Sequence, residues 1–173
     1  MPAVLRTATA ADLVAINEIY NHYVLLSTCT YQEEPEPLEG RRRWFEQHGG
    51  PHPVIVAEAD HLVIGWGSLS AFHPRSAFRH TVENSVYVHH QHQGRGIGSL
   101  LLQELINRAG SAGHRAIIGA IDGSQTASIA LHAKFHFQAA GRLGRVGLKF
   151  GRWLDLVYME LLLDRRDGTD GSD

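Results

Sequence analysis

The chain has 173 residues, of which 43% are hydrophobic and 20% are charged, a composition typical of one globular domain of ordinary size. Its 16 basic and 18 acidic residues give a formal charge of -2, so no overall positive field favours nucleic acid or an anionic membrane surface as a partner. The single cysteine, Cys29, excludes an internal disulfide and a multi-cysteine zinc site. The 12 histidines are the unusual feature of the composition and raise the question of a metal site.

The lack of any long apolar run predicts one soluble domain. No apolar stretch approaches the roughly 20 residues that a bilayer-spanning helix needs, and the first residues lack the build of a secretory signal. We therefore expect a single cytoplasmic domain over residues 1–164, with no nucleic-acid or membrane partner. The polar residues 165–173 have little to bury and are predicted to form a disordered tail.

The N-terminal part of the chain predicts a short strand followed by two helices. Residues 4–6 have strand character, and Thr9 and Asp12 then have the spacing of a helix-capping box. Apolar residues recur at helical spacing from there to about residue 24. A second helix is expected to begin after Pro37.

The middle of the chain changes to strand patterns. Residues 54–57 and 62–67 are β-rich runs separated by a short polar segment, as in a hairpin. Residues 81–88 form a further strand pattern, with Val82 and its period-two neighbours on one face.

A long helix is predicted after the next polar loop. Leu100, Leu101, Leu105 and Ile106 are expected to form its buried side. The remaining predicted elements are a strand covered on both faces at 116–120, a helix at 126–135, and strands at 139–146 and 154–162. This succession predicts an α/β protein with a mixed sheet layered by helices.

A glycine-rich segment at residues 93–99, between a strand and a helix, indicates an anion site. The alternating Gly94, Gly96 and Gly98 let the backbone approach an anion, and the first turn of a helix offers unpaired N–H groups. No Lys-Ser/Thr pair closes the segment as in a Walker A loop, and the spacing is not that of a dinucleotide-binding turn. The segment therefore predicts phosphate binding of another kind.

The run from Val86 through the glycine segment into an apolar helix resembles the acetyl-CoA signature of the GNAT N-acetyltransferase superfamily. Within it, the chain more closely resembles the phosphinothricin and methionine sulfoximine/sulfone N-acetyltransferases. The blocks that carry this resemblance are residues 19–21, 27–31, 81–88, 121–123, 127–132 and 146–155. The resemblance implies a GNAT fold, with a mixed sheet of about six to seven strands, about four flanking helices and a splayed strand pair that binds acetyl-CoA.

The resemblance also implies which residues hold the acetyl-CoA co-substrate. The strand backbone at residues 86–88 is expected to pair with the pantetheine arm, and the amides of the glycine segment to hold the pyrophosphate. The implied contacts are Val86, Tyr87, Val88, Gln93, Gly94, Arg95, Gly96, Ile97, Gly98, Ser99, Gln125 and Ser128. The chain departs from the family at Gln125, where Asn is usual, and at His136, where Gly is usual.

Glu83 and His132 are the candidate catalytic residues. Acetylation requires a neutral amine and hence a general base, for which Glu83 matches the family; the alternative is a surface or ion-paired carboxylate. His132 is a candidate acid or contact of the departing thiol, or else a packed helical residue. The N–H of Val88 is expected to stabilise the oxyanion. No partner pattern accompanies Cys29, so direct transfer in a ternary complex is favoured over a covalent route.

The resemblance implies a small amino-acid-like amine as acceptor, of the phosphinothricin, methionine sulfoximine or methionine sulfone type, and a homodimer. The acceptor's carboxylate needs a cation, and Arg75 matches a substrate-binding arginine of the family; the alternative is a solvated loop residue. The implied acceptor contacts are Arg75, Ser76, Ala77, Thr30 and Lys149. Lys149 has the alternative role of holding the terminal hairpin.

Two other functions remain open. A peptide or protein N-acetyltransferase on the same fold requires an open groove. A non-catalytic CoA-sensing or metal-binding protein would use His89, His90 and His92, because imidazole binds zinc, copper and nickel. Against metal binding, no Cys, Asp or Glu lies nearby in the sequence to complete a ligand set.

Overall fold

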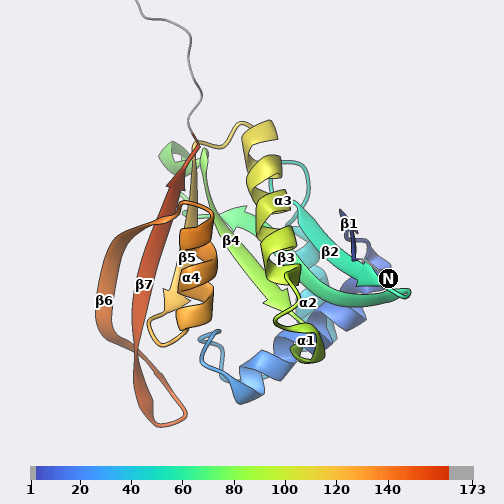
Figure 1. The fold of residues 1–173 in the computed structure, drawn as a ribbon, viewed down its shortest axis with the longest axis horizontal. Helices are drawn as coiled ribbons and strands as arrows, with labels where there is room; N and C mark the ends of the chain where they lie inside the picture. Colours follow the sequence, from blue (N-terminus) through green and yellow to red (C-terminus); the bar gives the residue numbers. More distant parts are fainter. Residues whose placement is uncertain (1–2, 164–173) are drawn as a thin grey trace, which may run out of the picture.

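The computed structural model describes residues 3–163, and its elements follow the predicted order (Figure 1). The strands are β1 (Val4–Thr7), β2 (Val54–Ala59), β3 (Leu62–Ala71), β4 (Thr81–Val88), β5 (Ala116–Asp122), β6 (Gln138–Lys149) and β7 (Arg152–Leu162). The α-helices are α1 (Leu13–Leu26), α2 (Leu38–Glu46), α3 (Ile97–Ser111) and α4 (Thr126–Lys134). The short 3₁₀ helices are η1 (Ala10–Asp12), η2 (Ser76–Phe78) and η3 (His90–His92). The predicted tail at 165–173 lies outside the described residues.

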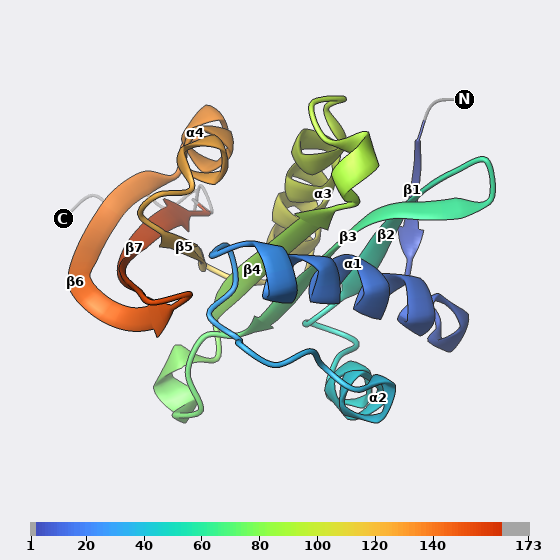
Figure 2. The same ribbon diagram turned by 90° about the horizontal axis from the view of Figure 1, so that it is seen from below.

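The strands of the described part form one seven-stranded sheet in the order β1-β2-β3-β4-β5-β7-β6. Neighbouring strands are antiparallel except β4 and β5, which are parallel. The helices α1 and α2 cover one face of this sheet, and α3 and α4 cover the other (Figure 2). The predicted α/β fold with a mixed sheet between helices is therefore confirmed.

Two apolar clusters hold the helices to the sheet. One lies under α3, where Leu101, Leu102 and Leu105 are fully buried, each contributing about 1.5–3 kcal/mol relative to an exposed position. The other lies under α1 and α2 around Trp66. The prediction that Leu100 is buried is wrong: its side chain is 45% exposed, because the helical period that buries Leu101 and Leu105 turns Leu100 to solvent.

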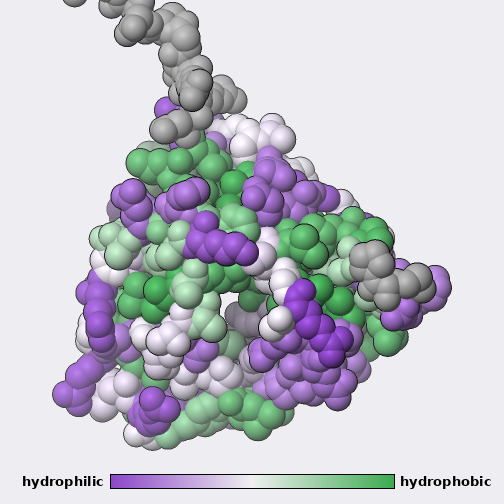
Figure 3. All heavy atoms as spheres, viewed as in Figure 1, coloured by the Kyte–Doolittle hydropathy of each residue, from purple (hydrophilic) through white to green (hydrophobic). Residues whose placement is uncertain are grey.

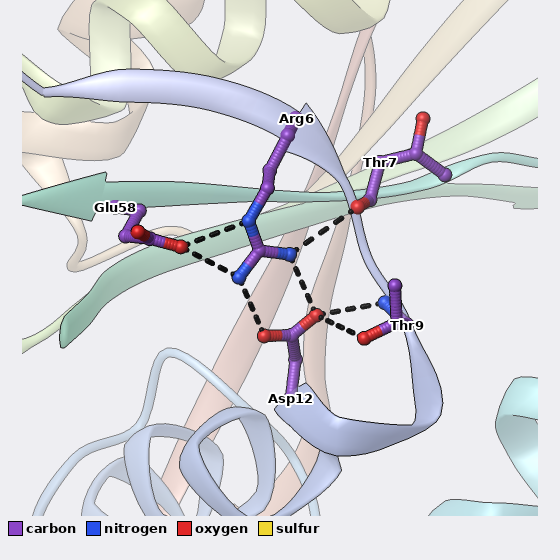
Figure 4. A network of polar contacts seen from close by, with 5 residues as sticks. All are labelled: Arg6, Thr7, Thr9, Asp12 and Glu58. Carbon is purple, nitrogen blue, oxygen red and sulfur yellow. Dashed lines mark hydrogen bonds and ion pairs between the residues drawn. The ribbon is translucent and has the colours of Figure 1, made fainter. Parts of the chain in front are cut away.

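A polar network fixes the start of α1 to the sheet (Figure 4). The Arg6 guanidinium donates to both carboxylate oxygens of Asp12 at 2.8 Å and to Glu58 of β2 at 2.9 Å. Asp12 also accepts the backbone N–H of Thr9 at 2.7 Å, so the predicted capping box is confirmed. The hydrogen bonds from Arg6 lower the pKa of Asp12 to about 2.

The strands β4 and β5 separate soon after they meet, which opens the sheet at its centre. Their register runs only from Thr81 opposite Ala116 to Glu83 opposite Ile118. β5 stays paired with β7 along its whole length, and β4 stays paired with β3, so the two halves of the sheet diverge. The space-filling view is hollowed at this place, between α3 and α4 (Figure 3).

Candidate active site

The glycine segment forms an open turn at the start of α3. Gly94 and Gly96 have φ angles of +72° and +80°, in the left-handed region that favours glycine. A Cβ added at either residue meets no atom within 4 Å, so the turn leaves open space beside its backbone. α3 begins directly afterwards at Ile97, and the first residues of this helix, whose N–H groups lack intrahelical partners, line the adjoining cavity. The turn therefore has the form of an anion cradle.

A cavity of about 860 Å³ lies where β4 and β5 separate, and it reaches this turn. Most of the predicted acetyl-CoA contacts line it: Val86, Tyr87, Val88, Gln93, Gly94, Gly96, Ile97, Gly98, Gln125 and Ser128. Arg95 and Ser99 do not line it. Arg95 is exposed at the tip of the turn, and Ser99 accepts a hydrogen bond from Lys134 at 3.4 Å.

The backbone of β4 presents donors to this cavity. His89 N–H donates to Ile64 of β3 at 2.9 Å, and hydrogen-bonding directions alternate along an antiparallel strand. The N–H groups of Val86 and Val88 consequently point away from β3, toward the side from which β5 has departed. The Val88 carbonyl accepts the Tyr23 hydroxyl, which in turn accepts from Gln93 at 2.7 Å. The strand end and the glycine turn are thus tied together through one tyrosine of α1.

Glu83 lies on β4 at the point of separation and lines the cavity. Its carboxylate has no ion-pair or hydrogen-bond partner among residues 3–163, which argues against the alternative of an ion-paired strand residue. Burial raises its pKa. A half-buried, unpaired carboxylate with a raised pKa has the properties of a general base in a cleft.

His132 lines the cavity from α4 and is held in a neutral form. Its side chain is only 4% exposed, and its Nδ1 lies 2.8 Å from the carbonyl oxygen of Ser128. Because a carbonyl only accepts, Nδ1 carries the proton, and Nε2 accepts from the Asn84 amide at 3.0 Å. Burial lowers the pKa of this imidazole. The arrangement favours a contact or packing role over a proton donor.

The other side of the cavity is lined by aromatic rings and an arginine. The Trp66 and Tyr87 rings stack with centroids 4.9 Å apart, and Tyr20 meets Tyr87 edge-on at 5.3 Å. Arg41 and Trp44 reach the same place from α2. The cavity therefore has a backbone-lined end at the glycine turn and a side-chain-lined end between α1, α2 and the sheet.

Residues 16–137 match the family model described as the acetyltransferase (GNAT) family. The chain belongs to the GNAT family of acetyltransferases. It is 41% identical over 167 residues to the L-amino acid N-acyltransferase MnaT of Escherichia coli, covering 96% of this chain and 97% of that protein. It is 40% identical over 168 residues to an L-methionine sulfoximine/L-methionine sulfone acetyltransferase of Salmonella typhimurium, covering 96% and 98%. A crystal structure of a GNAT phosphinothricin acetyltransferase from Sinorhizobium meliloti in complex with acetyl-CoA superposes with a TM-score of 0.91 at 39% identity, over 100% of this chain and 95% of that one.

Only one of the acceptor contacts expected from the GNAT resemblance lines the cavity. Thr30 lines the cavity, whereas Arg75, Ser76 and Ala77 are exposed at η2, beyond the ends of β3 and β4, and do not line it. Lys149 does not line it either: its side chain is 1% exposed and its Nζ donates to the Thr30 carbonyl at 2.8 Å. In this chain Lys149 therefore holds the cavity wall at Thr30 in place against β6.

The same wall contains Cys29 and is braced by Asp122. Burial raises the pKa of the Cys29 thiol, so it stays protonated, which disfavours a covalent route through it. The Asp122 carboxylate accepts from the Thr28 hydroxyl and from Ser124 at 2.6 Å. The Gln125 amide also donates to Thr28, at 3.1 Å, so the longer side chain at this GNAT position braces the wall as well as lining the cavity.

The histidines do not gather into a metal site. His22 and His90 stack at 4.1 Å, and His89 and His90 at 4.4 Å, beside the glycine turn. Within residues 3–163, no group of three or more His, Cys, Asp or Glu side chains is arranged to hold a metal ion. No helix in this part of the chain has the length and apolarity needed to cross a membrane.

Proposed function

We propose that this chain transfers the acetyl group of acetyl-CoA to the amine of a small amino-acid-like acceptor of the phosphinothricin, methionine sulfoximine or methionine sulfone type. The observation that carries the proposal is the single cavity that joins the glycine turn to Glu83 where β4 and β5 separate. The names of the relatives supply the acceptor class.

The residues present fit acetyl-CoA as the co-substrate. The open space beside Gly94 and Gly96 and the first turn of α3 suit a pyrophosphate, and the N–H groups of Val86 and Val88 suit an extended amide-bearing arm. Acetyl-CoA supplies a thioester whose acyl group is open to attack by an amine.

The chain's own residues then provide proton transfer and charge stabilisation. Glu83 takes a proton from the acceptor ammonium, directly or through one water, so that the amine becomes nucleophilic. The Val88 N–H stabilises the negative charge that develops on the carbonyl oxygen. CoA departs as a thiolate that takes its proton from water, and His132, neutral and hydrogen-bonded at both nitrogens, serves as a contact beside the sulfur.

The acceptor's α-carboxylate is proposed to bind Arg75. The η2 turn that carries Arg75 leaves the sheet where Phe72 N–H donates to Thr81 at 3.3 Å, two residues from Glu83. A carboxylate lies only two bonds from its α-amine, so the cation that binds it has to lie at the Glu83 end of the strand. Arg75 is exposed, its side chain has no hydrogen-bond or ion-pair partner within residues 3–163, and its guanidinium suits bidentate carboxylate binding.

A homodimer in the cytoplasm completes the proposal. The β6–β7 hairpin presents large apolar side chains to solvent: Leu143, Val146, Leu148, Phe150 and Trp153. Trp153 alone is 55% exposed, and exposed apolar side chains concentrated on one hairpin are typical of an interface. A second copy of the chain is the proposed partner.

An acceptor screen that detects free CoA thiol tests the function. Wild-type protein is incubated with acetyl-CoA and phosphinothricin, methionine sulfoximine, methionine sulfone, or short peptides. We expect thiol release with the amino-acid analogues and background release with peptides. Release with peptides alone would establish the protein acetyltransferase instead, and release with none of them would overturn the proposed activity.

A further inference from the structure

A buried arginine on the acceptor side of the cavity has no role in the chemistry described so far. Arg41 of α2 is 4% exposed and lines the cavity. Its guanidinium carbon lies 4.5 Å from the centre of the Tyr20 ring and 4.7 Å from that of Trp44. Its Nε donates to the Asn17 side chain at 3.2 Å. These ring contacts stabilise the cation and do not supply its terminal nitrogens with an oxygen acceptor.

The terminal nitrogens of Arg41 have no acceptor among residues 3–163, and no carboxylate there forms an ion pair with them. Glu36 is the acidic residue nearest in the cavity wall, but its carboxylate accepts from Gln32 at 3.2 Å and makes no ion pair with Arg41. A second donor is unsatisfied beside it, because the indole Nε1 of Trp66 is buried without an acceptor. Buried cations are normally paired, so the terminal nitrogens of Arg41 are free to bind acceptor oxygens of a ligand in the cavity.

The position of Arg41 relative to Glu83 indicates which part of an amino-acid acceptor can contact Arg41. Glu83 and Tyr87 lie on the same face of β4 and are four residues apart, which separates their backbones by roughly 13 Å. Arg41 belongs to the Tyr87 end, since its guanidinium lies 5.5 Å from the ring of Trp66, which pairs with Tyr87. An α-carboxylate stays close to the amine that Glu83 deprotonates. The end of an extended side chain can reach the Tyr87 end instead.

We propose that Arg41 and the rings of Tyr20, Trp44 and Trp66 form the subsite for the acceptor's side chain, and that Arg41 determines specificity there. The guanidinium edge binds an oxygen on phosphorus or sulfur, and the ring faces contact the adjoining methyl and methylene groups. This inference rests on the proposed function, and it names the side chain that selects, within the proposed acceptor class, for oxygens on phosphorus or sulfur.

Acceptor discrimination by an Arg41→Lys variant tests the subsite. kcat/KM is measured with phosphinothricin, methionine sulfone and methionine, whose thioether lacks the oxygens. Lysine keeps the positive charge but lacks the planar guanidinium that can donate two parallel hydrogen bonds. We therefore expect kcat/KM to fall about 30-fold for phosphinothricin and less than about threefold for methionine. Arg43→Lys is the matched control, since Arg43 lies on the same helix, is exposed, and has its only ion pair within the described residues with Glu39, at 3.7 Å. An equal loss on all three acceptors, or no loss on any, contradicts the inference.

A titration on the wild-type protein gives a second readout that needs no variant to fold. Phosphinothricin bound at the subsite lies against Trp44 and Trp66, so tryptophan emission is expected to change saturably, with the dissociation constant that calorimetry gives. Binding seen by calorimetry without any change in emission overturns the subsite. If the wild type acetylates none of the three acceptors, the proposed function fails on its own. The subsite is then judged by whether Arg41→Lys abolishes phosphinothricin binding; absence of binding to the wild type overturns it too.

Discussion

The two ends of the cavity are built from different material. At the glycine turn the groups that face the cavity are backbone N–H groups, and the local sequence of residues 93–97 determines their placement. At the acceptor end they are side chains from α1, α2, β3 and β4, which meet only because the fold brings Tyr20, Arg41 and Trp66 together. Binding at the glycine turn should therefore depend on the backbone conformation of that turn. Binding at the acceptor end should depend on the identity of each side chain that lines it.

The largest expected effect is at Glu83, because the proposed acetyl transfer needs its carboxylate whichever end of the cavity is altered. Glu83→Gln removes the proton acceptor without changing the shape of the cavity, so kcat should fall about 10²–10⁴-fold while the KM for acetyl-CoA stays within error. Burial raises the pKa of Glu83, so the wild-type rate should rise with pH as this carboxyl loses its proton above its ordinary range. The rising limb should disappear in the variant. A variant that keeps both the wild-type kcat and that limb would remove Glu83 from the role of base.

The cofactor end is tested through its backbone at Gly96. Gly96→Ala adds a methyl group into open space, but it penalises the left-handed φ of +80° by about 1–2 kcal/mol. We expect the KM for acetyl-CoA to rise about tenfold and the KM for the acceptor to stay unchanged. Gly110→Ala is the control, because Gly110 lies within α3, where alanine should stabilise the helix by about 0.5–1 kcal/mol. Equal acetyl-CoA affinities of the two variants would show that the turn conformation is not what binds the phosphates.

The proposed binding of the acceptor's carboxylate at the Glu83 end of β4 is tested through the charge of Arg75. Arg75→Ala should raise the KM for the acceptor by about five- to tenfold, with little change in the KM for acetyl-CoA, because a carboxylate loses its charged donor. Arg79→Ala serves as the control: Arg79 is exposed directly after η2, and its side chain donates to the Ser76 carbonyl, at 3.4 Å, and to no other group in residues 3–163. If Arg79→Ala raises the KM for the acceptor as much as Arg75→Ala does, the arginines at η2 attract the acceptor through their overall positive charge and Arg75 does not bind its carboxylate specifically.

The same contrast explains what the sequence could predict. The order of elements, the mixed sheet and the phosphate turn follow from local patterns: period-two and helical spacing, and glycines at the start of a helix. Arg41 was missed because three consecutive arginines resemble a solvated helix face. Only the spacing of Leu38, Arg41 and Trp44 indicates that one of them points inward. The partners of His132 could not be predicted either, since Asn84 lies 48 residues away and reaches it only where β4 leaves β5.

Two tyrosines of α1 offer the finest test, because one serves each end of the cavity. Tyr23 links the Val88 carbonyl to Gln93 at the cofactor end, and Tyr20 lies 2.9 Å from the Thr30 hydroxyl at the acceptor end. Tyr23→Phe should raise the KM for acetyl-CoA about two- to threefold and lower the free energy of unfolding by about 1 kcal/mol, since the Val88 carbonyl loses its donor and the Gln93 amide loses its acceptor.

Tyr20→Phe should raise only the KM for the acceptor, by a similar factor. The two variants of α1 can then be compared for their separate effects on acetyl-CoA and on the acceptor. Both keep their aromatic packing against Tyr87, so a difference between them reports the hydroxyl groups alone. Because the two hydroxyls share no partner, their effects on unfolding should add within about 0.5 kcal/mol in the double variant. If either variant shifts both KM values together, α1 couples the two ends of the cavity. The glycine turn and the acceptor end then do not bind their ligands independently.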